Sequence, residues 1–213
     1  MILNNIFSID KMSEIKVILV GESNTGKTSI IKAVMGRGFE SNECSTLGAS
    51  YESKTMKLND KEYTLSIWDT VGQEKFRSLT KIFLKDSKIV IIVYSITNKN
   101  SFKEIDFWYE TIKSNLGDKI VLGLAGNKKD LFQEEEITEE EGEEKAKEIG
   151  ALFKLTSAKT GLGIEDFFKI LLEEYVNKNG IGNINDNGKG AKLKAGNNKS
   201  KNQCKCWLII LVK

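Results

Sequence analysis

The sequence predicts an α/β fold: a six-stranded, mostly parallel sheet with one antiparallel strand and about five helices on both faces. Two observations support this prediction. Continuous apolar runs, typical of strands covered on both sides, alternate with segments of helical periodicity along most of the 213 residues. The first apolar run is followed directly by a glycine-rich turn and a helical segment, the order expected in a parallel sheet. We expect one domain over residues 13–178 and a flexible tail over residues 179–213.

The elements of the first half follow from hydrophobic pattern and turn residues. An apolar strand at 16–20 leads through the glycine-rich turn to a helix at 29–35. Residues 36–53 are polar and show no clear periodicity. Two extended segments follow, 54–58 and 63–68, and the tight-turn pair Asn59-Asp60 between them predicts a hairpin.

The second half repeats the alternation of strand and helix. Its expected strands are the apolar runs 89–94, 120–125 and 152–158. Helical spacing joins Phe102 to Leu116, and a capping box at Thr138–Glu141 opens a charged helix that ends at Gly150. A closing helix carries the apolar stripe Ile164, Phe167, Phe168, Leu171, Leu172, Tyr175 and Val176.

Composition excludes several kinds of site. With no histidine, the chain has neither a Ser–His pair nor an imidazole metal site. The net charge of +2 gives no polycation, and we expect no nucleic-acid partner. Three cysteines, Cys44, Cys204 and Cys206, suit a reducing cytosol better than a disulfide framework. We expect no signal peptide, and no run reaches the ~18 apolar residues that span a bilayer.

The glycine-rich turn has the pattern of a phosphate-binding loop. Gly21-Glu22-Ser23-Asn24-Thr25-Gly26-Lys27-Thr28 fits G-x-x-x-x-G-K-[ST] between a strand and a helix. Backbone amides and the helix N-terminus would face phosphate oxygens, Lys27 would reach the outer phosphates, and Thr28 would bind Mg²⁺. The alternative is an ordinary glycine-rich turn. The predicted phosphate-side residues are Gly21, Ser23, Asn24, Thr25, Gly26, Lys27, Thr28 and Ser29.

A second motif, Asp69-Thr70-Val71-Gly72-Gln73, follows the expected strand 63–68. Asp69, at a strand end facing the loop, is placed to hold Mg²⁺ directly or through water. The Gly72 N–H can meet a terminal phosphate, and Gln73 can orient a water because it both donates and accepts. Alone, Asp-x-x-Gly is a common turn, but its position about forty residues after a phosphate loop favours the functional interpretation.

Two further segments at neighbouring strand ends predict a guanine site. In Asn127-Lys128-Lys129-Asp130, the Asp130 carboxylate can accept two N–H groups that guanine presents and adenine does not. Asn127 would face the other base edge, and the Lys128 stem would cover the ring. In Thr156-Ser157-Ala158-Lys159, the Ala158 N–H can meet the base carbonyl, with Ser157 and Lys159 beside it. A solvated turn is the alternative for each segment taken alone.

Residues 14–176 resemble the small GTPases of the Ras superfamily, most closely the Rab family. The resemblance is carried by the motifs above, by residues 68–79, and by Tyr94-Ser95-Ile96-Thr97-Asn98. Residues 21–23 and 46–51 lean towards the endosomal Rabs. The resemblance implies a monomer that cycles between GTP-bound and GDP-bound states with Mg²⁺ and hydrolyses GTP slowly. The implied partners are an exchange factor, a GTPase-activating protein and effectors in vesicle traffic.

The resemblance also implies roles for individual residues. Gln73 and Lys27 would be catalytic, Thr46 would bring the second hydroxyl to Mg²⁺ beside Thr28 and Asp69, and Phe39 would pack on the guanine edge. The aromatic patch that effectors contact would consist of Tyr51, Trp68 and Phe83; partly buried structural aromatics are the alternative. These assignments match the family motif at the stated positions.

Departures from the family pattern leave other functions open. Val71 stands where the family has Ala, and a β-branched residue there stiffens the segment that carries Gln73. A nucleotide-loaded scaffold with weak hydrolysis is therefore an alternative. Ser95 stands where many Rab proteins have Asp, and residues 82–86 differ from the usual Rab sequence at this place. A phosphotransferase acting on a small substrate is a third possibility, against which residues 127–130 speak.

The tail carries charge and two cysteines. From 178 to 205 it holds seven lysines and one acid, Asp186, giving a net charge of +6. It is either a solvated linker or a segment attracted to anionic lipid. Cys204-Lys205-Cys206 resembles the prenylated end of Rabs, but seven residues, 207–213, follow it. We expect a peripheral protein on the cytosolic face of endomembranes, held by lipidation of Cys204 and Cys206 or by shallow insertion of 207–213.

Overall fold

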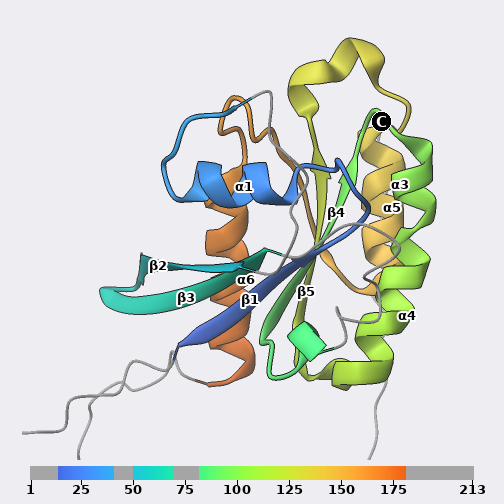
Figure 1. Cartoon of the computed structure of the whole chain (residues 1–213). Helices are drawn as coiled ribbons and strands as arrows, with labels where there is room; N and C mark the ends of the chain where they lie inside the picture. Colours follow the sequence, from blue (N-terminus) through green and yellow to red (C-terminus); the bar gives the residue numbers. More distant parts are fainter. Residues whose placement is uncertain (1–13, 41–49, 70–81, 181–213) are drawn as a thin grey trace, which may run out of the picture. The chain divides into compact units, whose positions relative to one another are not determined.

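A six-stranded sheet forms the centre of the computed structural model, which describes residues 14–40, 50–69 and 82–180 (Figure 1). The strand order is β2-β3-β1-β4-β5-β6. β2 is antiparallel to β3, and all other neighbouring pairs are parallel, which confirms the predicted mixed sheet. The strands are β1 (Ile15–Val20), β2 (Ser50–Leu58), β3 (Lys61–Asp69), β4 (Ile89–Ser95), β5 (Val121–Asn127) and β6 (Leu152–Leu155).

Helices cover both faces of the sheet, as predicted (Figure 1). α1 and α6 lie on one face, and α3, α4 and α5 lie on the other. Within the described ranges, no helix combines the length and apolar character needed to cross a bilayer. The helices are α1 (Lys27–Val34), α3 (Lys99–Lys103), α4 (Ile105–Leu116), α5 (Glu139–Ile149), α6 (Ile164–Lys178) and the 3₁₀ helices η2 (Gly117–Lys119) and η3 (Lys129–Glu134).

The core consists of two apolar clusters separated by the sheet. β4 shows the reason for its continuous apolar sequence, since all seven residues are buried. Ile89 and Ile91 face the cluster under α1 and α6, whereas Val90 and Ile92 face the cluster under α4 and α5. A strand buried on both sides needs apolar residues at every position, and this requirement produces the unbroken run in the sequence.

Three differences from the sequence prediction are larger than a shift of one or two residues. β2 begins at Ser50, inside the stretch without periodicity, because its first residues are exposed at the edge of the sheet and have no apolar face to show. The helical stripe from Phe102 is divided into α3 and α4 at Glu104. The last strand ends at Leu155, because the Ser157 N–H donates to the Leu162 carbonyl oxygen and the chain turns back.

The predicted turn and caps are confirmed. Asn59 and Asp60 both have positive φ, 49° and 61°, as a two-residue type I′ hairpin requires. In the capping box, the Glu141 N–H donates to Thr138 Oγ1 at 3.2 Å and the Thr138 N–H donates to Glu141 Oε2 at 2.8 Å. Gly150 ends α5 with φ 67°.

The glycine inside α5 is expected to be essential for packing. A Cβ on Gly142 would lie 2.5 Å from the Tyr94 hydroxyl oxygen and 2.6 Å from Phe153 Cζ. Tyr94 is fully buried, so its ring cannot move away freely. Gly142→Ala should therefore lower the free energy of unfolding by about 1–3 kcal/mol through overpacking, although alanine is the better helix former. Urea denaturation measures this change.

The matched control for this substitution is Gly38→Ala. Gly38 has no atom within 4 Å of the Cβ position and no left-handed φ, so alanine there should leave stability unchanged within about 0.5 kcal/mol or raise it slightly. Equal stability of the two variants would show that α5 and β4 can separate without cost.

Candidate functional site

The loop between β1 and α1 forms one side of the candidate site. Gly21 has φ 141° and Gly26 has φ 93°, and a Cβ at either would collide, at 2.2 Å with the Val93 carbonyl oxygen and at 2.3 Å with Asn127 Nδ2. Asn24 has φ 61°, a left-handed conformation that asparagine tolerates well. The two motif glycines are thus required by the backbone and by close neighbours. The loop ends at the N-terminus of α1, where the helix dipole favours an anion.

Lys27 lies buried within this loop. Its ammonium donates to the carbonyl oxygens of Gly21 at 2.9 Å and Glu22 at 2.8 Å. Burial lowers the pKa of Lys27 to about 8, while the carboxylates of Asp69 and Glu22 act in the opposite direction. A phosphate placed in the loop would supply the strong negative charge that this buried cation lacks. Ser23 and Ser29 are both partly buried, and they lie in the loop and in the first turn of α1, respectively.

Two of the three predicted metal ligands lie in contact. The Thr28 hydroxyl donates to Asp69 Oδ2 at 2.7 Å, although 41 residues separate them in the chain. The contact arises because β1 and β3 are parallel neighbours whose carboxyl ends meet at one edge of the sheet. A hydroxyl and a carboxylate are oxygen ligands of the kind that Mg²⁺ prefers, so this pair fits a magnesium ion. Thr46, the third predicted ligand, lies outside the described residues.

A small pocket of about 200 Å³ adjoins the loop on the side of β5. Eight of the residues that line it were predicted from the sequence, although they come from four separate segments of the chain. Leu131, the ninth, was not predicted, because it follows the motif as an ordinary apolar residue. The lining residues are Gly26, Ser29, Phe39, Asn127, Lys128, Asp130, Leu131, Ala158 and Lys159.

The predicted base-reading carboxylate is held in place by Ser157. The Ser157 hydroxyl donates to Asp130 Oδ1 at 2.6 Å, and Ser157 itself is fully buried. This hydrogen bond holds the carboxylate in place through Oδ1 and does not involve Oδ2. Lys128 has φ 71°, and burial lowers the pKa of its ammonium while Asp130 and Glu134 oppose the shift. Its partly buried stem lines the pocket, as the sequence predicted.

Asn127 has a role that the sequence did not predict. Its side chain is 1% exposed. Nδ2 donates to the Thr25 carbonyl oxygen at 2.8 Å, and Oδ1 accepts from the Ala158 N–H at 3.2 Å and the Thr156 hydroxyl at 3.3 Å. The side chain therefore joins the phosphate loop to the segment after β6. In this arrangement the Ala158 N–H, predicted to meet a base carbonyl, is directed at Asn127.

The three predicted patch aromatics lie next to one another. Tyr51 and Trp68 are cross-strand partners of β2 and β3, and their rings stack with centroids 5.1 Å apart. Phe83 follows at 6.1 Å from Trp68. Tyr51 is 58% exposed, so the patch reaches the surface. The Lys16 ammonium lies 4.8 Å from the centre of the Trp68 ring and donates to the Lys85 carbonyl oxygen at 2.8 Å, which holds the middle ring in place.

Several predicted residues lie outside the described ranges. They are Thr46, Gly72 and Gln73 with the neighbouring Val71, and Cys204 and Cys206 in the tail. The chain divides into two units, 1–182 and 183–213, and the second of these is not described. The roles assigned to these residues from the sequence therefore remain predictions.

Comparison with protein families agrees with the fold. The family model described as the Ras family matches residues 16–177, which is more than half of the chain. This span begins in β1 and ends in α6, so it contains every described residue of the candidate site and the whole sheet except Ile15. The chain therefore belongs to the Ras family, the small GTPases that switch between GTP-bound and GDP-bound states.

Proposed function

We propose that this GTPase is a Rab-like switch that recruits effectors to membranes in vesicle traffic. It binds GTP or GDP with Mg²⁺ and acts on the cytosolic face of endomembranes, of which endosomes fit the sequence best. An exchange factor loads GTP and an activating protein accelerates hydrolysis. The observation that carries this proposal is the aromatic patch of Tyr51, Trp68 and Phe83, in which Trp68 directly precedes Asp69 at the end of β3. The tail with Cys204 and Cys206 supplies the membrane contact.

The described residues have separate tasks in this proposal. Lys27 and the loop amides bind the phosphates, Thr28 and Asp69 hold the metal ion, and Asp130 reads the base. The metal ion offsets negative charge on the phosphates when it is bound. Gln73 orients the attacking water but carries no charge, so hydrolysis without a partner is slow. Asn127 keeps the phosphate side and the base side at a fixed separation.

A single-turnover hydrolysis experiment separates this switch from the scaffold alternative. We expect protein loaded with GTP to hydrolyse it with a rate constant on the order of 10⁻⁴–10⁻³ s⁻¹, the range of the intrinsic Ras reaction. Val71→Ala should change this rate by less than about threefold, because Gln73 can still reach the water. The scaffold with weak hydrolysis would instead be supported by two results together. The wild-type rate constant would be near zero, and Val71→Ala would raise it about tenfold or more.

The patch should be required for effector capture and dispensable for nucleotide binding. Tyr51→Ala removes the exposed end of the stack, and Phe83→Ala removes the other end. Each variant, loaded with a non-hydrolysable GTP analogue, should retain at most about a tenth of the proteins that the wild type captures from cytosol in the GTP state only. Affinity for GTP should stay within about twofold, since neither ring lines the nucleotide pocket.

The control for the patch is Phe107→Ala, which removes an exposed aromatic ring from α4. This variant should capture the same proteins as the wild type. Loss of nucleotide binding in Tyr51→Ala and Phe83→Ala, in step with the loss of capture, would mean that the aromatic rings serve the fold only.

A further inference from the structure

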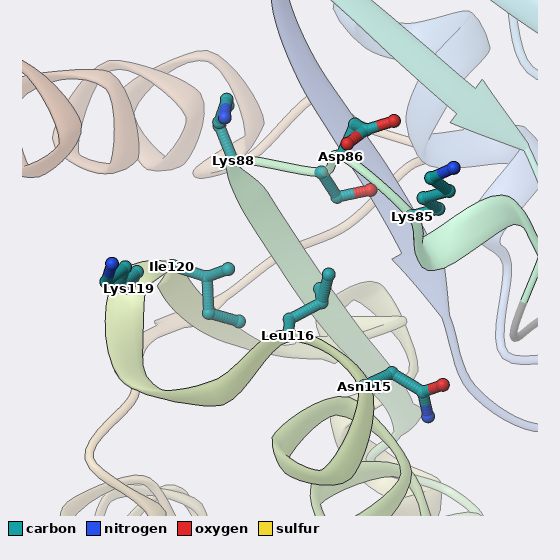
Figure 2. Close-up of a pocket in the computed structure, with 8 residues that line it drawn as sticks. Lys85, Asp86, Lys88, Asn115, Leu116, Lys119 and Ile120 are labelled. Atoms are coloured by element: carbon teal, nitrogen blue, oxygen red, sulfur yellow. The ribbon is translucent and has the colours of Figure 1, made fainter.

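A basic pocket of about 470 Å³ lies at the end of the sheet opposite the phosphate loop (Figure 2). Two segments line it: 85–88, which precedes β4, and 115–120, which precedes β5. The nucleotide motifs follow the carboxyl ends of the strands, and β4 and β5 each have seven residues. At ~3.3 Å per residue the two sites are roughly 20 Å apart, so a ligand here would not compete with the nucleotide.

Three exposed lysines surround this pocket, Lys85, Lys88 and Lys119. Within the described residues, none of the three forms an ion pair with a carboxylate. Some other described lysines do, for example Lys129 with Glu135 at 3.1 Å and Lys145 with Asp106 at 2.6 Å. Three ammonium groups without a described carboxylate partner therefore border this one pocket.

The pocket has one described carboxylate, that of Asp86, and a lysine outside the pocket offsets it. Burial lowers the pKa of Lys16 and the charge of Asp86 raises it, so these two groups interact. In Figure 2 the Asp86 carboxylate points away from Leu116 and Ile120. The described lining residues thus comprise three lysines and one carboxylate, which gives the pocket a net positive charge.

The walls are joined by backbone hydrogen bonds, so the lysines have a fixed base. The Val121 N–H donates to the Lys88 carbonyl oxygen at 2.9 Å, and the Lys88 N–H donates to the Lys16 carbonyl oxygen at 2.9 Å. The partly buried side chains of Leu116 and Ile120 provide an apolar floor between the charged groups. In the wall, the buried Ser87 hydroxyl has no hydrogen-bond partner among the described residues.

We propose that this pocket binds a small ligand with several phosphate groups, such as a phosphorylated inositol ring. Lysine binds phosphate as a point charge at the end of a flexible stem, so these three side chains can turn towards a compact polyphosphate. The carbon ring would rest on Leu116 and Ile120. The volume lies within the ~300–1,000 Å³ of small-molecule sites, which suits such a ring better than an extended acidic peptide. The ligand is either free or the headgroup of a lipid.

The test uses the full chain loaded with GDP and Mg²⁺, and inositol 1,4,5-trisphosphate as the probe. Lys88→Gln with Lys119→Gln should weaken binding, measured by calorimetry, at least about tenfold, because two charged contacts are lost. The control pair, Lys103→Gln with Lys169→Gln, changes net charge equally on α3 and α6 and should stay within about twofold. The basic tail is present in every variant, so its contribution cancels.

Asp86→Asn gives a change in the opposite direction. Asparagine suits the φ of 64° at this position, and loss of the carboxylate should tighten binding by about twofold to fivefold. Unchanged GDP affinity in the pocket variants shows that they are folded. Vesicles of phosphatidylcholine with a phosphatidylinositol bisphosphate, against vesicles of equal charge with phosphatidylserine, distinguish the two sources. Sedimentation of the wild type with the bisphosphate vesicles only, lost in Lys88→Gln with Lys119→Gln, supports a lipid headgroup as the ligand. If the double variant loses binding of the free inositol phosphate but sediments with vesicles like the wild type, the ligand is soluble.

Three results would overturn the proposal. The first is no binding of either probe, and the second is equal loss of binding in the pocket pair and the control pair, which would mean attraction to net charge alone. The third is equally tight binding by a peptide of ten glutamates that competes with the inositol phosphate, which would mean an acidic protein surface as the occupant. None of these depends on effectors or hydrolysis, so the proposal is tested separately from the Rab-like function.

Discussion

Asp130→Asn is expected to lower affinity for GTP by about a hundredfold or more and to create affinity for xanthosine triphosphate. The wild-type carboxylate accepts two N–H groups of guanine, and charged hydrogen bonds contribute about 1.5–3 kcal/mol each. The Ser157 hydroxyl holds Oδ1, so the new NH₂ group takes the place of Oδ2. An NH₂ group cannot accept from the exocyclic amine of guanine, but it can donate to the carbonyl that xanthine has there.

Competition against a fluorescent GTP analogue measures both affinities. The matched control is Asp60→Asn, the same chemical change at the exposed hairpin turn, where asparagine fits the φ of 61°. It should bind GTP like the wild type. If wild-type protein binds ATP as tightly as GTP, or if Asp130→Asn keeps its preference for GTP over the xanthine nucleotide, Asp130 does not read the base.

Lys27→Ala is expected to reduce affinity for both GTP and GDP by about a hundredfold or more. Lys27 is the cation inside the phosphate loop, and its buried position means that little water competes for a bound phosphate. The carbonyl oxygens of Gly21 and Glu22 position the ammonium but do not neutralise it. Removal of the ammonium therefore leaves the phosphate charge to the loop amides and the metal ion alone.

Lys32→Ala is the control, since it removes a lysine from the same helix. Lys32 forms its ion pair with Glu40 at 3.1 Å and lines no part of the nucleotide pocket. Its loss should change nucleotide affinity by less than about twofold, as is usual for an exposed ion pair. Dissociation constants from stopped-flow fluorescence separate the two variants. A change below about threefold in Lys27→Ala would remove this residue from phosphate binding.

The central strands and the phosphate loop could be predicted from the sequence because local physics determines them. Burial on both faces forces the unbroken apolar run of β4. The collisions that a Cβ would cause at Gly21 and Gly26 require the glycines of the motif. The edge strand β2 was less predictable, because exposed positions place no demand on hydrophobicity and its start at Ser50 left no pattern.

The parts of the site that depend on contacts across the fold could not be predicted. Asn127 has the motif position of a base-reading residue, yet its amide contacts Thr25 and Ala158. No local pattern states which carbonyl an amide will meet across the sheet. Leu131 joined the pocket for the same reason, since η3 turns it towards Phe39 and Lys128. The basic pocket before β4 and β5 likewise comes from two segments that share no motif.

The bridge from Asn127 to Thr25 also constrains the order of folding. The two residues are 102 positions apart, and Thr28 and Asp69 are 41 apart, so each contact closes a long loop at an entropic cost. Such contacts form only after β1, β3 and β5 have aligned, and long-range pairing is slow. We therefore expect the nucleotide site to be completed late in folding, and a fragment that lacks β5 to be unable to assemble it. Retention of nucleotide consequently reports that the whole sheet, from β1 to β5, is intact.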